Sequence, residues 1–126
     1  MNYVIAVKSP VYGHQGAFLA YQVAFSLLKQ GHAISQIFFF QEGVSHGNAA
    51  VYPASDEFNL QQAWQALAQQ YRIPLHLCVA ASQRRGVVDE LTVKQPQQAN
   101  LAAHFVIAGL GEFITAVLKA DRVISL

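Results

Sequence analysis

The chain has 126 residues, the usual size of one domain, so we expect a single domain over residues 1–126 with one hydrophobic core. Apolar residues make up 53% of it and charged residues only 12%, roughly half the usual charged fraction. This composition indicates that a subunit interface covers part of the apolar surface. The formal net charge of +1, spread over scattered basic residues, argues against a nucleic-acid-binding surface.

The apolar runs are too short for a membrane segment, which needs roughly 20 residues. The apolar stretch at residues 3–7 follows no basic segment, so we expect no signal peptide, no membrane contact and a cytoplasmic location. The only cysteine, Cys78, has no partner for an internal disulfide, and a reducing compartment suits a free thiol.

The first half of the chain predicts two strands, one helix and a long loop. Residues 2–8 and 33–40 are typical of buried strands. The turn GHQG at 13–16 opens a helix from about 15 to 30, which is apolar nearly all round and therefore expected to be buried on more than one side. Residues 41–55 are expected to form a long loop, and such loops in compact domains are often functional.

The second half predicts two amphipathic helices and three more strands. Ser55, Asp56 and Glu57 would supply a cap and first-turn acids for a helix that runs to about Tyr71. Residues 86–100 are polar and carry no clear pattern. The other predicted elements are strands at 74–79, 105–108 and 122–126, a short helix at 80–85 and an amphipathic helix at 110–118.

Strands that alternate with helices predict an α/β fold with a mainly parallel sheet of about five strands. Right-handed crossovers would place helices on both faces, in Rossmann-like layering. Sites in such sheets form beyond the carboxyl ends of the strands. We therefore expect one crevice where residues 10–16, 41–55 and 78–85 converge, with Tyr12 and Gly13 on the first of these segments.

Cys78 ends the third predicted strand, just before the short helix. Unpaired amides at a helix start and a nearby guanidinium both favour a thiolate. Arg84 or Arg85 would supply the guanidinium, and the small residues before them, including Ser82, leave room for a reactive group. Free cysteines are also among the most buried residues, so position alone leaves Cys78 evenly balanced between nucleophile and core residue.

The spacing of Cys78 and Arg84 is also the C-x5-R signature of cysteine-dependent phosphatases. The match is partial, because Leu77 stands where those enzymes usually have histidine and no glycine lies in between. GHQG is neither a G-x-G-x-x-G turn nor a P-loop, so we predict no nucleotide.

The five histidines lack metal-ligand spacing, so we expect no metal and no other cofactor. Two of them, His14 and His46, lie on the segments expected to form the crevice. A third, His76, shares a strand face with Cys78. These three are the candidates to assist a thiolate.

Several blocks of the sequence, in order and over nearly the whole chain, resemble the DsrE/DsrF-like family of sulfur-relay proteins. The match is weakest at residues 91–104. The blocks are SPVYG (9–13), FFFQEGV (38–44), YPASDEFNLQQAW (52–64), LCVAASQRRGVVDE (77–90), GLGE (109–112) and DRVISL (121–126).

The resemblance implies a DsrE-like sulfurtransferase domain in which Cys78 is the catalytic residue. Cys78 would accept sulfane sulfur as a persulfide from a TusA-like donor and pass it to a TusE-like acceptor, for 2-thiouridine at the tRNA wobble position. The implied complex is a heterohexamer with TusB-like and TusC-like subunits, a dimer of heterotrimers without direct nucleic-acid contact. Arg84, Arg85, Ser82, Tyr12 and Gly13 are the supporting candidates.

Three alternatives stay open from the sequence. The first is a DsrE-type subunit of dissimilatory sulfur oxidation, and the second is an enzyme similar to the C-x5-R phosphatases. The third is a non-catalytic assembly subunit in which Cys78 only fills the core.

Overall fold

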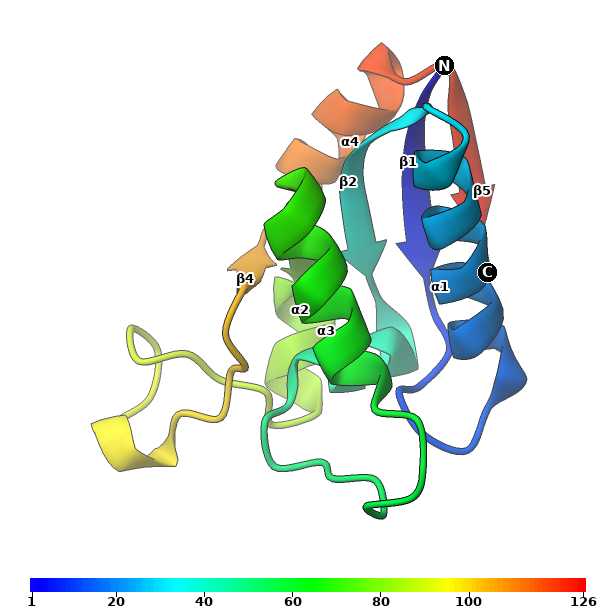
Figure 1. The fold of residues 1–126 in the computed structure, drawn as a ribbon. Coiled ribbons are helices and arrows are strands. Elements are labelled where there is room, and N and C mark those ends of the chain that lie inside the picture. The colour runs from blue at the N-terminus through cyan, green and yellow to red at the C-terminus, as the bar shows by residue number, and fades with distance from the viewer.

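Five parallel strands form one sheet in the computed structural model, which describes residues 1–126 (Figure 1). They lie in the order β4-β3-β2-β1-β5, so the last strand of the chain pairs with the first. The predicted α/β class and parallel five-stranded sheet are confirmed. The strands are β1 (Asn2–Val7), β2 (Ala33–Phe39), β3 (Leu75–Cys78), β4 (Phe105–Ala108) and β5 (Arg122–Ser125).

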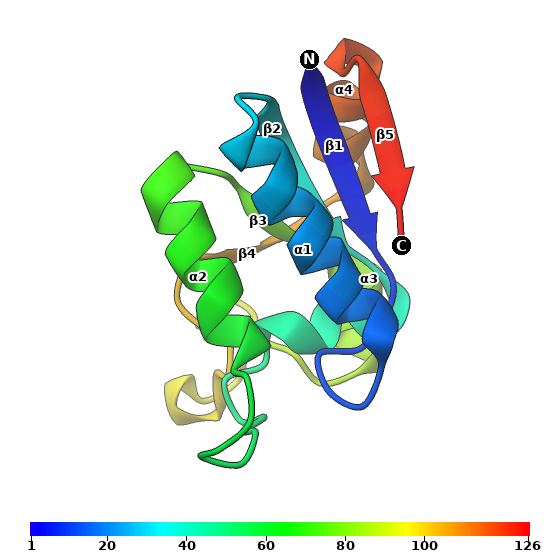
Figure 2. The same ribbon diagram turned by 45° about the vertical axis from the view of Figure 1, so that its right-hand side comes forward.

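Helices cover both faces of this sheet. Helices α1 (Gln15–Lys29) and α2 (Leu60–Tyr71) lie on one face, and α4 (Leu110–Lys119) lies on the other (Figure 2). The chain adds β1 to β4 in one direction, and from β4 it returns across the sheet to β5. A right-handed crossover in the return direction places its helix on the opposite face. None of the helices has both the length and the apolar character needed to cross a membrane.

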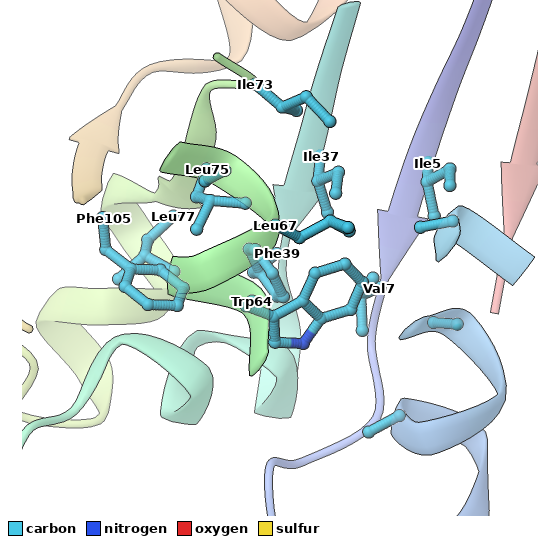
Figure 3. Close-up of a cluster of buried hydrophobic side chains, with 14 of the residues drawn as sticks. Ile5, Val7, Ile37, Phe39, Trp64, Leu67, Ile73, Leu75, Leu77 and Phe105 are labelled. Carbon is cyan, nitrogen blue, oxygen red and sulfur yellow. The ribbon is translucent and has the colours of Figure 1, made fainter. Parts of the chain in front are cut away.

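The main core lies between the sheet and the pair α1–α2 (Figure 3). Trp64 of α2 is fully buried and meets the ring of Phe39 edge-on, with centroids 5.5 Å apart. Since side chains alternate along a strand, the residues between these core positions point to the α4 face. The core-facing residues of the three central strands are Ile5, Val7, Ile37, Phe39, Leu75 and Leu77.

Helix α1 packs through its small residues, with Ala17, Ala20 and Ala24 fully buried. Its large residues face outwards and stay exposed. The prediction that this helix is buried on more than one side is therefore not met within the single chain, because alanines allow close approach to the sheet on one side only. The exposed side chains are Phe18 at 40%, Leu19 at 47% and Phe25 at 41%.

Helix α2 begins later than predicted. Its N-cap is Asn59, whose side chain accepts a hydrogen bond from the backbone N–H of Gln62 at 3.0 Å. Glu57 instead serves the preceding loop, where its carboxylate accepts bonds from the Ala54 N–H at 2.8 Å and the Tyr12 hydroxyl at 2.7 Å. The predicted cap at Ser55 was wrong because Asn59 offers the same capping chemistry immediately before the helix.

The segment after β2 is more ordered than the predicted loop. Residues Gln41–Gly47 form a short 3₁₀ helix, η1, against the end of β1. A Cβ atom at Gly43 would overlap the carbonyl oxygen of Val7, so only glycine permits this close approach. The approach places Glu42 beside α3 (Val79–Arg84), the short helix that follows β3. A second 3₁₀ turn, η2 (Pro96–Gln98), lies in the segment without a sequence pattern.

Candidate functional site

A cavity of about 420 Å³ lies on the α4 face, at the carboxyl ends of the strands. Eight of its twelve lining residues are apolar. Helix α4 forms one wall, and its Phe113 stacks on Phe38 of β2 with ring centroids 4.3 Å apart. The lining residues are Ala6, Phe38, Phe40, Gln41, Cys78, Ala81, Arg84, Arg85, Leu110, Phe113, Val123 and Ser125.

Cys78 reaches this cavity because β3 runs into α3 without a loop. It is the last residue of the strand and also the N-cap of the helix, with φ −59° and ψ 125°. Leu77 points into the main core, so strand alternation turns Cys78 to the α4 face. The free thiol is half-buried and lines the cavity. Cys78 is therefore reachable for chemistry.

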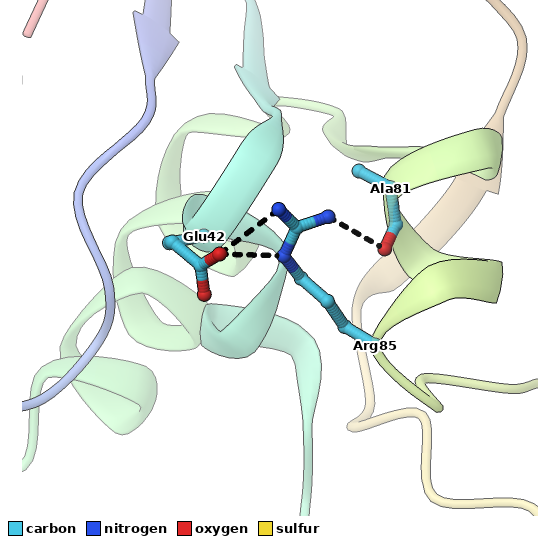
Figure 4. A network of polar contacts seen from close by, with 3 residues as sticks. All are labelled: Glu42, Ala81 and Arg85. Atoms are coloured by element: carbon cyan, nitrogen blue, oxygen red, sulfur yellow. Dashed lines mark hydrogen bonds and ion pairs between the residues drawn. The ribbon is translucent and has the colours of Figure 1, made fainter.

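The two neighbouring arginines have different surroundings. The Nε and one terminal nitrogen of Arg85 each lie 2.9 Å from Oε1 of Glu42, and its other terminal nitrogen donates to the carbonyl of Ala81 at 3.3 Å (Figure 4). These contacts hold α3 against η1. Arg84 lines the same cavity, and no carboxylate pairs with it. Its charge therefore remains available to an anion in the cavity.

The other three supporting candidates lie away from this cavity. Ser82 is fully buried within α3. Tyr12 and Gly13 line a separate hollow on the α1 side, where the Tyr12 hydroxyl is bound to Glu57. The prediction of one crevice from three converging segments is wrong, because residues 10–16 fold towards α1 and only Gln41 of the second segment reaches the cavity.

Sequence reasoning missed two walls of the cavity. Leu110 and Phe113 come from α4, and Val123 and Ser125 come from β5. The pairing of β5 with β1 brings β5 to the cavity, and α4 follows because it connects β4 to β5. No local sequence pattern specifies this strand order. The alternation of side chains along β3 could have indicated the face, because it places Cys78 opposite Leu77, but it does not reveal which elements cover that face.

The three candidate histidines lie in different surroundings. His14 caps α1, where its Nδ1 accepts a hydrogen bond from the Gly16 N–H at 3.0 Å. His46 is fully buried, with Nε2 3.0 Å from the carbonyl oxygen of Ser9. Neither lines the cavity. The expectation that His14 and His46 lie near the chemistry is therefore wrong.

His76 does not line the cavity either, but it shares the sheet face of Cys78 two residues away on β3. Its Nδ1 lies 3.4 Å from Oε2 of Glu112, in the first turn of α4. Burial lowers the pKa of His76, and the Glu112 carboxylate partly offsets that effect. The imidazole is therefore mainly neutral at pH 7.

Comparison with known proteins places the chain in a family. The model of the DsrE/DsrF-like family matches residues 1–126. The chain belongs to this family. It is 70% identical over 126 residues to a protein of Haemophilus influenzae and 68% identical to one of Pasteurella multocida, each covering all of both chains. Both relatives are named sulfurtransferase TusD homolog.

Two less similar proteins cover nearly the same length. A Proteus mirabilis protein named sulfurtransferase TusD is 49% identical, over 98% of this chain and 97% of its own. The crystal structure of the YchN protein from E. coli superposes with a TM-score of 0.80 and 24% identity, over 99% of this chain and 98% of that one. The likeness to YchN confirms the fold.

The buried His46 predicts a loss of stability in acid. Desolvation lowers its pKa from 6.5 to about 4, so the unfolded chain binds a proton that the native core excludes. The contribution is complete above pH 6.5 and is lost as pH falls from 6.5 towards 4, by about 3 kcal/mol. Urea unfolding between pH 4.5 and 7.5 measures it.

The control for that measurement is His46→Gln, which keeps an amide donor for the Ser9 carbonyl. Its free energy of unfolding should fall less steeply below pH 6.5 than that of the wild type. Equal slopes for the two proteins would refute the assignment to His46.

Proposed function

We propose that this chain is a sulfurtransferase that carries sulfane sulfur as a persulfide on Cys78. The observation that carries the proposal is the placement of its one thiol, half-buried in an apolar cavity at the start of α3. The full-length relatives named sulfurtransferase TusD support the transfer of sulfur as the reaction.

The transfer step passes one sulfur atom from the donor's persulfide to the thiolate of Cys78. The Cys78 thiolate attacks the outer sulfur of the donor's persulfide, the donor's sulfur–sulfur bond breaks, and the donor thiolate leaves. A new bond joins Cys78 Sγ to the transferred sulfur, so the site changes from thiol to persulfide without an external oxidant or reductant. A second exchange, with the acceptor's thiolate attacking, passes the sulfur on.

The cavity suits a persulfide in two respects. Its apolar walls, which include Phe38, Phe40 and Phe113, limit the access of water and small thiols that would remove the sulfur. The unpaired guanidinium of Arg84 and the first-turn amides of α3 favour negative charge on sulfur as it is exchanged. Arg85 contributes by holding α3 in place through Glu42.

The proposed partners are a TusA-like donor, a TusE-like acceptor, and TusB-like and TusC-like subunits in a heterohexamer. Exposed apolar side chains on α1 and α4 support assembly, because a monomer rarely leaves such surfaces uncovered. On α4 they recur at a spacing of four residues, a pattern that suits packing against another helix. These residues are Leu110, Ile114 and Leu118.

Two observations disfavour the phosphatase alternative, although Cys78 and Arg84 both line the cavity. Residues Val79–Arg84 form a helix and not an open anion-binding loop, although they span the C-x5-R spacing. The walls are mainly apolar, which disfavours a dianionic phosphate ester.

Loading of sulfur tests the proposal directly. The protein is incubated with a cysteine desulfurase, cysteine and a TusA-like donor, and its intact mass is measured. We expect a gain of one sulfur atom that a reductant removes, and no gain in Cys78→Ser. Ser125→Ala, which alters the same cavity without touching the thiol, should load like the wild type. No gain in the wild type with a fully loaded donor would end the proposal.

The destination of the sulfur is tested in cells. We propose the tRNA wobble position, which is the destination that the resemblance to sulfur-relay proteins implies. A strain whose only copy carries Cys78→Ser should lose 2-thiouridine from its tRNA nucleosides, as measured by mass spectrometry. Normal 2-thiouridine in that strain, with defective sulfur oxidation, would favour the dissimilatory pathway instead.

A further inference from the structure

Cys78 has one ionisable base on its own face of the sheet, and that base is His76. The two residues are separated by one position on β3, so both side chains point towards α4. Their Cα atoms are roughly 6.6 Å apart at the usual rise of a strand. Side chains at that spacing are near enough for one water molecule to bridge the imidazole and the thiol and to carry a proton between them.

The first turn of α4 orients the His76 ring. Glu112 Oε2 lies 3.4 Å from Nδ1, and the stacking of Phe113 on Phe38 holds that turn against the sheet. The two atoms make no hydrogen bond, but the negative charge of the carboxylate near Nδ1 favours a proton on that nitrogen, which leaves Nε2 as the proton acceptor. The His76 side chain is only 13% exposed, whereas that of Glu112 is 68% exposed.

The other charged groups around His76 are few. The neighbours across the sheet are Phe38 on β2 and Val106 on β4, both uncharged. Helix α3 contributes Arg84 and Arg85 to the cavity, and Glu42 of η1 neutralises the second of these. Glu112 of α4 is therefore the only carboxylate beside the ring.

We propose that His76, oriented by Glu112, moves the proton of the sulfur exchange at Cys78. This inference rests on the proposed function and goes beyond it by naming the acid–base group. Nε2 takes the proton from the Cys78 thiol, and the resulting thiolate attacks the outer sulfur of the donor persulfide. The donor's sulfur–sulfur bond breaks, and the imidazolium returns the proton to the departing donor thiolate. The imidazole is then neutral again, and no proton or electron is left over.

The protonation state of the His76 imidazole suits a general base. Burial keeps the pKa of His76 below its usual 6.5, so the ring is neutral and able to accept a proton at pH 7. The Glu112 carboxylate raises the pKa again in part, which strengthens the base.

The first test measures Cys78 as a nucleophile, without any sulfur donor. Alkylation by iodoacetamide is followed by mass spectrometry between pH 5 and 9 in the wild type, His76→Gln and Glu112→Gln. We expect the rate at pH 7 to fall roughly tenfold in His76→Gln, and roughly threefold in Glu112→Gln. The pH of half-maximal rate should rise in both variants. His32→Gln, at the other end of the sheet, is the matched control.

If the His76–Glu112 contact only stabilised the fold, replacing either residue would lower the midpoint of thermal unfolding. The pH profile of alkylation would then stay unchanged. Profiles of His76→Gln and Glu112→Gln that superimpose on the wild type would overturn the proposal. Because Glu112 is mostly exposed, its variant should fold even if His76→Gln does not, and an unchanged profile in Glu112→Gln alone would then contradict the proposed orientation of the ring.

The second test uses glutathione persulfide as the donor. Transfer needs His76 as base and then as acid, whereas alkylation needs only the base. Loading should therefore fall by a larger factor than alkylation, roughly a hundredfold in His76→Gln. Equal factors would refute the return of the proton. If the wild type accepts sulfur but the alkylation profiles of the variants do not shift, only this inference fails. If the profiles shift but the wild type accepts no sulfur, only the proposed function fails.

Discussion

Along β3, neighbouring side chains must point to opposite faces of the sheet, and most of the site depends on this alternation. Leu75 and Leu77 fill the core beneath α1 and α2, so His76 and Cys78 are directed to the α4 face. The strand then passes into α3 without a loop, which leaves Cys78 at the boundary between strand and helix. A slip of one residue in the register would bury the thiol in the main core and expose Leu77 to the cavity.

The order of the strands supplies the rest of the site. Because β5 pairs with β1, the chain must return across the sheet after β4, and α4 makes that return over the face of Cys78. The same helix contributes an apolar wall through Phe113 and a carboxylate through Glu112. One crossover thus provides both the shelter for a reactive sulfur and the partner of His76.

Local patterns were sufficient to predict most elements of the fold. The strand at 105–108 has the predicted bounds, and α1 begins at the predicted Gln15. The start of α2 was harder to predict, because Ser55 and Asn59 can both cap a helix. Only the contacts of Glu57 with Tyr12 and Ala54, which hold it in the preceding loop, decide between them. The outer face of α1 was harder still, since an apolar sequence does not distinguish burial in a core from exposure.

The site was predicted only in part for a different reason. Cys78, Arg84 and Arg85 are neighbours in the chain, so their proximity follows from sequence. Val123 and Phe113 reach the cavity through long-range pairing, and no periodicity reveals it. His46 was misplaced because a histidine in a loop is usually exposed, whereas η1 carries this one into the core.

The central claim is that sulfur passes through Cys78. Its most direct test is a single-turnover chase, in which protein loaded with labelled sulfur is mixed with a TusE-like acceptor and the label is followed on both. The account predicts that label leaves the peptide containing Cys78 at the rate at which the acceptor gains it. Label that stays on Cys78 while the acceptor is loaded at the same rate by the Cys78→Ser protein and donor would contradict it.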